Sequence, residues 1–170
     1  MGGLQLHTSR LRLRPLCPGD AAFVVRLLND PDFLLHIGDR GVRSEDDARR
    51  YIAEGPMASH ARHGFGLDCV EMLSGEPAGI CGLLRRPALE DADVGYALLP
   101  EFRGRGLAAE AVDAVLRDAR VRLGLRRVAA VVADGNVRSV RLLEKAGFEP
   151  CGRVRLTEQA PEIALYLREL

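Results

Sequence analysis

The residues that most suggest chemistry form a glycine-rich loop at 99–108, which reads Leu-Pro-Glu-Phe-Arg-Gly-Arg-Gly-Leu-Ala. The pattern before it predicts a strand, and apolar residues at spacings of three and four after it predict a helix. Gly104 and Gly106 allow a sharp turn and leave backbone N–H groups open to a ligand. Because those groups lie at the positive end of a helix dipole, they can bind an anion. Arg103 and Arg105 add positive charge at the rim, so the loop is a candidate pyrophosphate site.

The residues alone leave several interpretations of this loop open. In the simplest, Gly104 and Gly106 only allow a tight turn from strand to helix. In another, residues 104–109 match Gly-x-Gly-x-x-Ala, a loose form of the fingerprint with which oxidoreductases bind dinucleotides. The acidic residue expected about twenty positions later is missing, because Arg127 and apolar neighbours occupy that segment. A nucleotide-triphosphate P-loop is excluded, because no Gly-Lys-Ser/Thr follows.

Three linked motifs resemble one known family. Arg103-x-x-Gly106-x-Ala108 is similar to the Arg/Gln-x-x-Gly-x-Gly/Ala acetyl-CoA signature of the GNAT superfamily of N-acetyltransferases. Asp93-Val-Gly-Tyr96 stands one strand earlier, and the asparagine-led run 136–148 stands one helix later, in that family's order and spacing. The run 101–111 most resembles the branch that acetylates the N-terminal alanine of ribosomal proteins.

The resemblance implies where a cofactor would bind. Acetyl-CoA is the implied co-substrate, with its pyrophosphate on the backbone N–H groups of Arg103, Gly104, Arg105, Gly106, Leu107 and Ala108. The strand at Tyr96, Ala97 and Leu98 would lie along the pantetheine arm, with one N–H group as the oxyanion donor. Asn136 would contact the same arm through its side chain, although asparagine is also a favoured helix N-cap. The family's usual chemistry is direct attack by the amine, without an acyl-enzyme.

The groups that would move protons are less clear. The tyrosine that many GNAT enzymes use as general acid is replaced by Leu143. Ser139 is the available hydroxyl; it would relay a proton or hydrogen-bond the sulfur, or it is an ordinary residue of the first helical turn. Asp93 would draw a proton from the amine through water, or it is a solvated carboxylate. On a strand Asp93 and Tyr96 face opposite sides, so they share a site only across a bulge. An amine already partly neutral could also react through proximity alone, and the base stays unassigned.

The acceptor pocket is expected in the N-terminal half of the chain. The loop 33–39, which includes His36, and the helix that starts at Ser44 are its expected walls. The resemblance favours a protein or peptide N-terminus as the acceptor, with a small-molecule amine as the alternative. Two other functional classes stay open: a non-catalytic acetyl-CoA-binding module and a dinucleotide-binding oxidoreductase.

The elements that must position these residues follow the order β-α-α-β-β-β-α-β-α-β-β. Alternation predicts one half-buried strand over 4–16, and periodicity predicts a helix capped by Asp20 that stops at Pro31. A capping box at Ser44 and Asp47 predicts a second helix, interrupted at Gly55 and Pro56. The remaining strands are expected at 65–72, 78–84, 93–99, 127–132, 148–156 and 163–168, with helices over 108–123 and 136–147. These elements predict one α/β domain over 1–170, a GNAT-like mixed and mostly antiparallel sheet flanked by helices, with a central parallel β-α-β crossover.

Composition limits the classes of partner. Lys and Arg number 24 and Asp and Glu number 24, and this zero net charge argues against a protein that grips nucleic acid through phosphates. Four widely spaced cysteines indicate thiols in a reducing compartment. His60 and His63 have no accompanying ligand cluster, so no metal is expected. No stretch resembles a signal peptide or membrane span, so we expect a cytoplasmic protein that does not bind membranes. The sequence leaves monomer and homodimer open.

Overall fold

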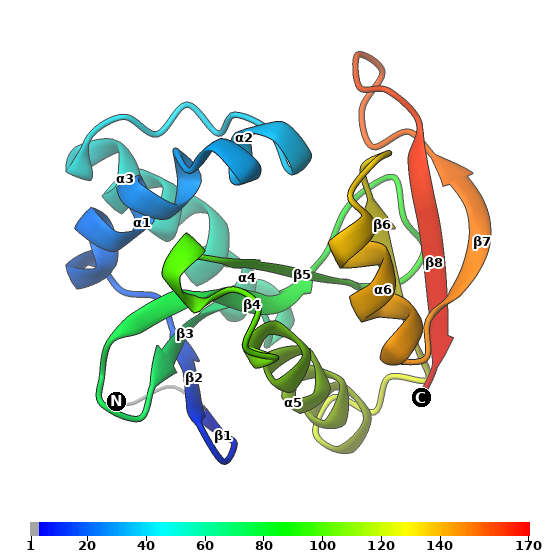
Figure 1. Ribbon diagram of the computed structural model, residues 1–170, viewed down its shortest axis with the longest axis horizontal. Helices are drawn as coiled ribbons and strands as arrows, with labels where there is room; N and C mark the ends of the chain where they lie inside the picture. Colours follow the sequence, from blue (N-terminus) through cyan, green and yellow to red (C-terminus); the bar gives the residue numbers. More distant parts are fainter. Residues whose placement is uncertain (1–3) are drawn as a thin grey trace.

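Eight strands form one mixed sheet, in the order β1-β2-β3-β4-β5-β6-β8-β7 (Figure 1). The computed structural model describes residues 4–170; residues 1–3 of the expected domain lie outside that range. The strands are β1 Leu6–His7, β2 Leu11–Pro15, β3 Leu67–Met72, β4 Pro77–Leu84, β5 Asp93–Leu98, β6 Arg127–Val132, β7 Glu149–Val154 and β8 Ile163–Glu169. Neighbouring strands are antiparallel except β5 and β6, which are parallel. The expected fold class, including the β-α-β crossover, is confirmed.

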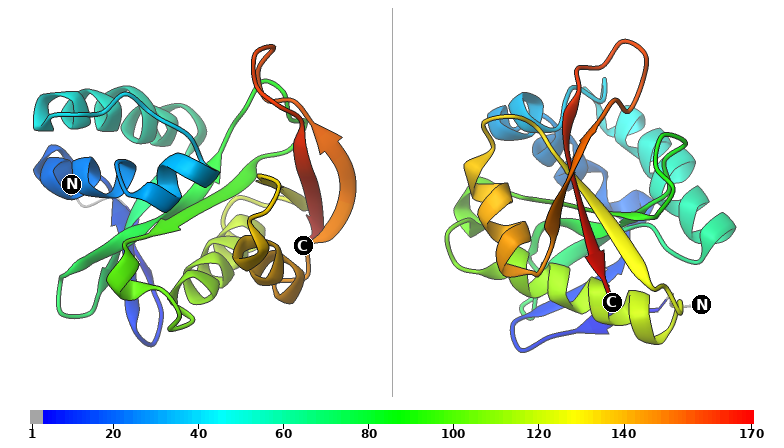
Figure 2. Two further views of the ribbon diagram at one scale, coloured as in Figure 1. Left: turned by 45° about the horizontal axis from the view of Figure 1, so that its top comes forward. Right: turned by 90° about the vertical axis from the view of Figure 1, so that its right-hand side faces the viewer.

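Helices cover both faces of the sheet (Figures 1 and 2). Before β3 the chain forms η1 Pro18–Asp20, α1 Ala21–Leu28, α2 Pro31–His36, α3 Glu45–Ile52, the π-helical turn η2 Ala53–Met57 and α4 Ala58–His63. After β5 it forms η3 Pro100–Phe102, α5 Leu107–Val121 and α6 Val137–Lys145. Helices α5 and α6 lie on one face, and α1, α3 and α4 lie on the other. No helix among residues 4–170 has the length and apolarity to span a bilayer.

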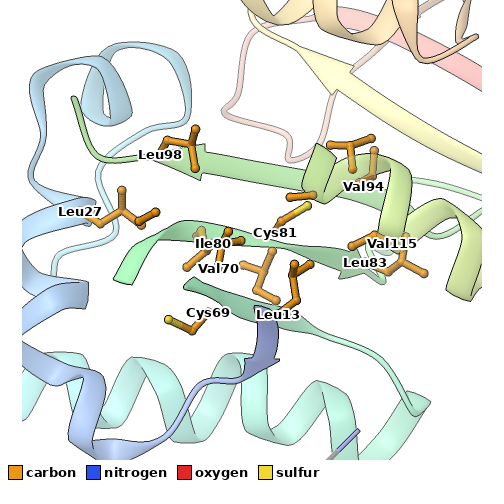
Figure 3. Packing of buried hydrophobic residues seen from close by; sticks show 14 of the residues in the cluster. Leu13, Leu27, Cys69, Val70, Ile80, Cys81, Leu83, Val94, Leu98 and Val115 are labelled. Carbon is orange, nitrogen blue, oxygen red and sulfur yellow. The ribbon is translucent and has the colours of Figure 1, made fainter. Parts of the chain in front are cut away.

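The hydrophobic core fixes α5 against the centre of the sheet. Figure 3 shows Val115 of α5 close to Val94 of β5 and Leu83 of β4, among other buried aliphatic side chains. Leu107 and Val112 of the same helix are also fully or almost fully buried. Burial of each such side chain contributes roughly 1.5–3 kcal/mol. The start of α5, and the loop before it, are therefore held firmly relative to β5.

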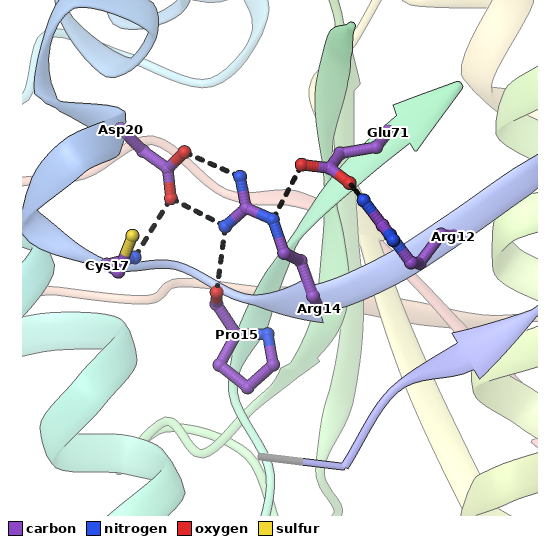
Figure 4. Close-up of polar contacts among 6 residues, drawn as sticks. All are labelled: Arg12, Arg14, Pro15, Cys17, Asp20 and Glu71. Carbon is purple, nitrogen blue, oxygen red and sulfur yellow. Dashed lines mark hydrogen bonds and ion pairs between the residues drawn. The ribbon is translucent and has the colours of Figure 1, made fainter. Parts of the chain in front are cut away.

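Charged side chains on β2 and β3 form a second, ionic cluster (Figure 4). The Arg14 guanidinium donates to Asp20 at 2.7 Å and to Glu71 at 2.6 Å. Arg12 donates to the same Glu71 carboxylate at 2.5 Å. Asp20 also accepts from the Cys17 N–H at 2.9 Å. Two arginines and two carboxylates thus balance one another, and the cluster fixes the segment that leads into α1.

Three local expectations for the N-terminal third were wrong in detail. The expected strand over 4–16 is the hairpin β1–β2, because the Leu11 N–H donates to the Thr8 hydroxyl and turns the chain. Asp20 precedes α1 but does not cap it, because its carboxylate binds Arg14 and Cys17 instead.

The segment 33–39 was expected to be a loop, but residues 31–36 form the helix α2. Pro31 follows the end of α1 and is the first residue of this new helix, which Asp30 caps. The expected interruption at Gly55 and Pro56 is confirmed, because the π-helical turn η2 that contains both residues separates α3 from α4. The capping box of Ser44 and Asp47 is confirmed, with reciprocal bonds of 3.1 and 3.2 Å.

Candidate functional site

The glycine-rich loop lies between the end of β5 and the start of α5, as expected. After the turn η3, the Arg103 N–H donates to the Pro100 carbonyl at 3.2 Å. Gly104 and Gly106 then have φ angles of 75° and 76°. These left-handed conformations strain any residue with a Cβ, and both glycines are therefore required by the path of the chain.

The N–H groups that follow are the part of the loop that can bind an anion. The first helical hydrogen bond of α5 joins the Glu110 N–H to the Gly106 carbonyl at 3.2 Å. The N–H groups of Gly106, Leu107, Ala108 and Ala109 precede that bond and have no intrahelical acceptor. Gly104, Gly106 and Ala109 are exposed, and a Cβ added at Gly104 would meet no atom within 4 Å. Leu107 is buried and Ala108 is partly exposed, so the most accessible donors at the positive end of this 15-residue helix belong to Gly106 and Ala109, where they fit a pyrophosphate.

The two arginines of the loop differ in their surroundings. The Arg103 side chain is only 21% exposed, and it donates to Asp30 at 2.5 Å and to Asp32 at 2.8 Å. It also donates twice to the Leu98 carbonyl, at 2.9 and 3.1 Å. Arg105 is exposed and lies 5.9 Å from the centre of the Phe102 ring. Arg105 is thus free to meet a phosphate, whereas the Arg103 guanidinium is turned to carboxylates.

The strand β5 offers backbone donors in the opening between β5 and β6. The two strands share one paired position, Asp93 with Ala129, and then diverge (Figure 2). The Leu99 N–H donates to the Ala78 carbonyl of β4 at 2.8 Å. Alternation along an antiparallel pair therefore turns the Ala97 N–H toward β4 and those of Tyr96 and Leu98 toward the opening. Tyr96 and Leu98, rather than Ala97, can present an oxyanion donor there.

Two expected site residues meet across this opening. The Tyr96 hydroxyl lies 2.5 Å from the Ser139 Oγ, which joins β5 to the first turn of α6. The Ser139 N–H in turn donates to the Asn136 side chain at 3.3 Å, so Asn136 caps α6 as expected. Burial raises the pKa of Tyr96 to about 12, against a smaller lowering by the Ser139 hydrogen bond. The phenol therefore stays protonated at neutral pH and can donate to the serine.

Asp93 does not join this group. The regular pairing of β4 with β5 contains no bulge, so Asp93 and Tyr96 face opposite sides of the sheet. Asp93 is fully buried and accepts from Arg86 at 3.0 Å. Burial raises the pKa of this carboxyl, and Arg86 opposes the rise. The strand-end carboxylate is thus half of a buried ion pair rather than a solvated group. Leu143, which stands where the resemblance led us to expect a tyrosine, is buried in the core.

His60 and His63 have their partners outside the loop. His60 pairs with Asp68 at 2.8 Å, and His63 stacks on Phe65 with ring centres 5.5 Å apart. His36 ends α2. Among residues 4–170, no three His, Cys, Asp or Glu side chains gather closely enough to hold a metal ion. A cavity of about 550 Å³ lined by Arg85, Asp91 and Arg126 lies at the start of β5, the end opposite to the loop.

Some residues at the site were not expected from the sequence. Asp30 and Asp32 stand 73 and 71 positions before Arg103, and nothing in the local pattern marks them as its partners. The Tyr96 hydroxyl was also missed, because only the backbone of that residue was assigned a role. The position of Asp30 directly before a proline is the one signal that could have revealed its capping function.

Comparisons with known proteins agree with this geometry. The family model of the acetyltransferase (GNAT) domain matches residues 10–149. An N-acetyltransferase of Bacillus subtilis, YoaA, is 28% identical over 151 residues, which are 88% of this chain and 85% of that protein.

Two solved structures share the fold. RimL, a ribosomal α-N-protein acetyltransferase, is 17% identical with a TM-score of 0.82, over 98% of this chain and 94% of that one. MccE, a microcin self-immunity acetyltransferase solved with acetyl-CoA and AMP, is 16% identical with a TM-score of 0.81, over 96% of this chain and 94% of that one. At these identities the two structures show a common fold only.

Proposed function

The chain belongs to the GNAT acetyltransferase family and is an acetyl-CoA-dependent acetyltransferase; on that premise we propose that it transfers the acetyl group directly to a primary amine, preferably the N-terminus of a protein. The observation that carries the proposal is the hydrogen bond between Tyr96 and Ser139. It joins a hydroxyl of β5 to one of α6, on the strand whose Tyr96 and Leu98 N–H groups turn away from β4.

The loop and the start of α5 hold the cofactor in this proposal. The N–H groups from Gly104 to Ala108 bind the pyrophosphate, and the exposed Arg105, which lies 5.9 Å from the centre of the Phe102 ring, adds a positive charge. The Arg103 N–H is already bonded to Pro100, so Arg103 contributes to the shape of the loop instead. The backbone of Tyr96, Ala97 and Leu98 borders the pantetheine arm, and Asn136 lies at its far side.

The reacting groups follow from the same arrangement. Acetyl-CoA supplies a thioester whose carbonyl carbon forms the new bond to the amine nitrogen while the carbon–sulfur bond breaks. The N–H group of Tyr96 or Leu98 stabilises the negative charge that develops on the carbonyl oxygen. Ser139 donates its proton to the leaving sulfur, and Tyr96 donates to the Ser139 oxygen in the same step. Solvent water returns a proton to this pair.

Water also takes the proton that the amine loses. Asp93, the carboxylate expected as a base, is separated from Ser139 by the sheet and is bonded to Arg86. An amine that enters in its neutral form needs no base of its own, because orientation beside the carbonyl supplies much of the rate.

The acceptor class rests on two kinds of support. The run 101–111 resembles the ribosomal-protein branch, and RimL, which shares the fold, is named for action on a protein α-amine. The walls of the acceptor side are α2 and α3. Leu34 and Leu35 of α2, and Ile37 directly after it, are at least one-third exposed. An apolar wall suits a peptide segment better than a small polar amine.

All four cysteines are free thiols, which supports a reducing, cytoplasmic setting.

Release of free thiol from acetyl-CoA over an amine panel tests this proposal. We expect turnover on a peptide that begins with alanine to exceed turnover on free amino acids and on a polyamine. Turnover on the small amines alone would overturn the protein acceptor. Binding of acetyl-CoA without turnover on any amine would indicate a non-catalytic module instead.

A further inference from the structure

Arg103 joins three elements that are far apart in the sequence. Its backbone lies in the loop before α5, its guanidinium donates to the Leu98 carbonyl at the end of β5, and it also donates to Asp30 and Asp32. Asp30 and Asp32 belong to the start of α2, on the acceptor side of the molecule. One side chain therefore connects the anion site to the expected acceptor wall.

The charges around Arg103 show that it is not placed to attract a phosphate. One guanidinium faces two carboxylates, so the group carries a net negative charge. The Arg103 side chain is 21% exposed, and that of Asp30 is 7% exposed. A phosphate that approached this guanidinium would have to displace at least one carboxylate from a short hydrogen bond.

Helix α2 depends on the same contacts. Asp30 is its N-cap and accepts from the Phe33 N–H at 3.3 Å, with the oxygen that also accepts from Arg103. The helix has six residues, and Phe33 is the only one that is buried. So short a helix is marginal without such support. A second ion pair, between Arg26 of α1 and Glu101, links the same two regions at 2.6 Å.

We propose that Arg103 is a positioning residue that couples acetyl-CoA binding at the loop to the order of α2 at the acceptor pocket. The inference rests on the proposed binding of acetyl-CoA to the loop. A ligand on the N–H groups of the loop fixes its backbone and so fixes the base of the Arg103 side chain. Arg103 then holds Asp30 and Asp32, and the start of α2 is ordered. Because coupling is reciprocal, ordering of α2 strengthens acetyl-CoA binding by the same factor.

Amide hydrogen exchange in α2 measures this coupling without turnover. Exchange of residues 32–38 would be followed with and without acetyl-CoA in the wild type, Arg103→Lys and Asp32→Asn. The lysine keeps the charge, but its ammonium has only three donors and no rigid fork for the four hydrogen bonds that the Arg103 guanidinium makes. Asp32 is half exposed, so its change leaves the buried Asp30 pair intact. Asp46→Asn is the matched control, because it removes an exposed ion pair with Arg49 in α3.

We expect acetyl-CoA to slow amide exchange in α2 about fivefold in the wild type and in Asp46→Asn. A fivefold effect is at the lower end of the range that is typical of coupling between two sites. Arg103→Lys should reduce this protection to less than about twofold. The protection in Asp32→Asn should lie between that of Arg103→Lys and that of the wild type. The acetyl-CoA dissociation constant of Arg103→Lys should rise by about the same fivefold and no more.

Four other outcomes would overturn the inference. Unchanged protection in Arg103→Lys would show that α2 is ordered by other contacts. A rise of about 100-fold in the acetyl-CoA dissociation constant of Arg103→Lys, with tighter binding in Asp32→Asn, would make Arg103 a phosphate ligand. A wild type that does not bind acetyl-CoA would remove the premise and the proposed function with it, whereas binding without protection of α2 rejects the coupling alone.

Discussion

Arg14 and Arg103 each bind two carboxylates, and they differ in what lies beside them. Arg14 holds Asp20 and Glu71, and with Arg12 the charges balance within a cluster between β2, β3 and η1 (Figure 4). Arg103 holds Asp30 and Asp32 without a second arginine, directly before a loop with unused N–H groups. The same ion pairing thus stabilises the fold in one place and borders a ligand site in the other. Arginine and carboxylate alone do not reveal function; the neighbouring backbone donors do.

The largest effect is expected from breaking the balanced cluster. Arg14→Leu should lower the free energy of unfolding by about 3 kcal/mol, because Asp20 loses its ionic partner and Glu71 loses one of two. Both carboxylates are less than one-tenth exposed. Acetyl-CoA affinity of the folded variant should not change. Urea unfolding and calorimetry measure the two quantities, with the exposed Arg117→Leu as control. A loss of affinity with no loss of stability would reverse the roles given to the two clusters.

A second test separates chemistry from ion pairing. Ser139→Ala should lower kcat by about 100-fold, because the leaving sulfur loses its proton donor. Tyr96→Phe should lower kcat by about tenfold, since the serine remains but loses its partner. The double variant should be no slower than Ser139→Ala, because the two hydroxyls act as one unit.

Steady-state rates with the best amine of the panel give these values, and calorimetry checks that acetyl-CoA binding is retained. Effects that simply multiply would show that Tyr96 and Ser139 act independently.

The smallest effect concerns acid stability. Burial alone would raise the pKa values of Asp20 and Glu71, but hydrogen bonds from Arg14, joined by Arg12 for Glu71 and by Cys17 for Asp20, lower both below their ordinary values. A lowered folded-state pKa contributes stability above the unfolded-state pKa of about 4, and this stability is lost as pH falls through the folded value.

Thermal unfolding between about pH 6 and pH 3 should therefore show a steeper loss for the wild type than for Glu71→Gln, which lacks one of these groups. Parallel curves would mean that Glu71 does not contribute to acid sensitivity.

The sequence predicted the cofactor side of the molecule closely, because its signals are local. Strand β6 has the expected bounds, Arg127–Val132, since a short continuous apolar run fits only a central strand. Asn136 caps α6 as its residue type suggests. The loop with Gly104 and Gly106 lies between strand and helix, as its two glycines require.

The contacts that complete the candidate site could not be predicted, because they join distant segments. Tyr96 and Ser139 are 43 positions apart and meet only because the crossover through α5 places α6 beside β5. Arg103 meets Asp30 across 73 positions. On the acceptor side, the short helix α2 lacks the periodicity that reveals a longer one, and Asn29-Asp30-Pro31 is equally typical of a stop and a new start.

Calorimetric titration with acetyl-CoA of the wild type and Ala109→Glu tests the central claim, that the start of α5 holds the cofactor. Ala109 is exposed in the first turn of α5, where a carboxylate stabilises the helix dipole but repels a phosphate. Loss of binding therefore could not be attributed to unfolding. Val121→Glu places the same charge at the exposed far end of the helix as a control. We predict that Ala109→Glu raises the dissociation constant at least about tenfold and that Val121→Glu leaves it unchanged. Equal affinity in all three proteins would contradict the account.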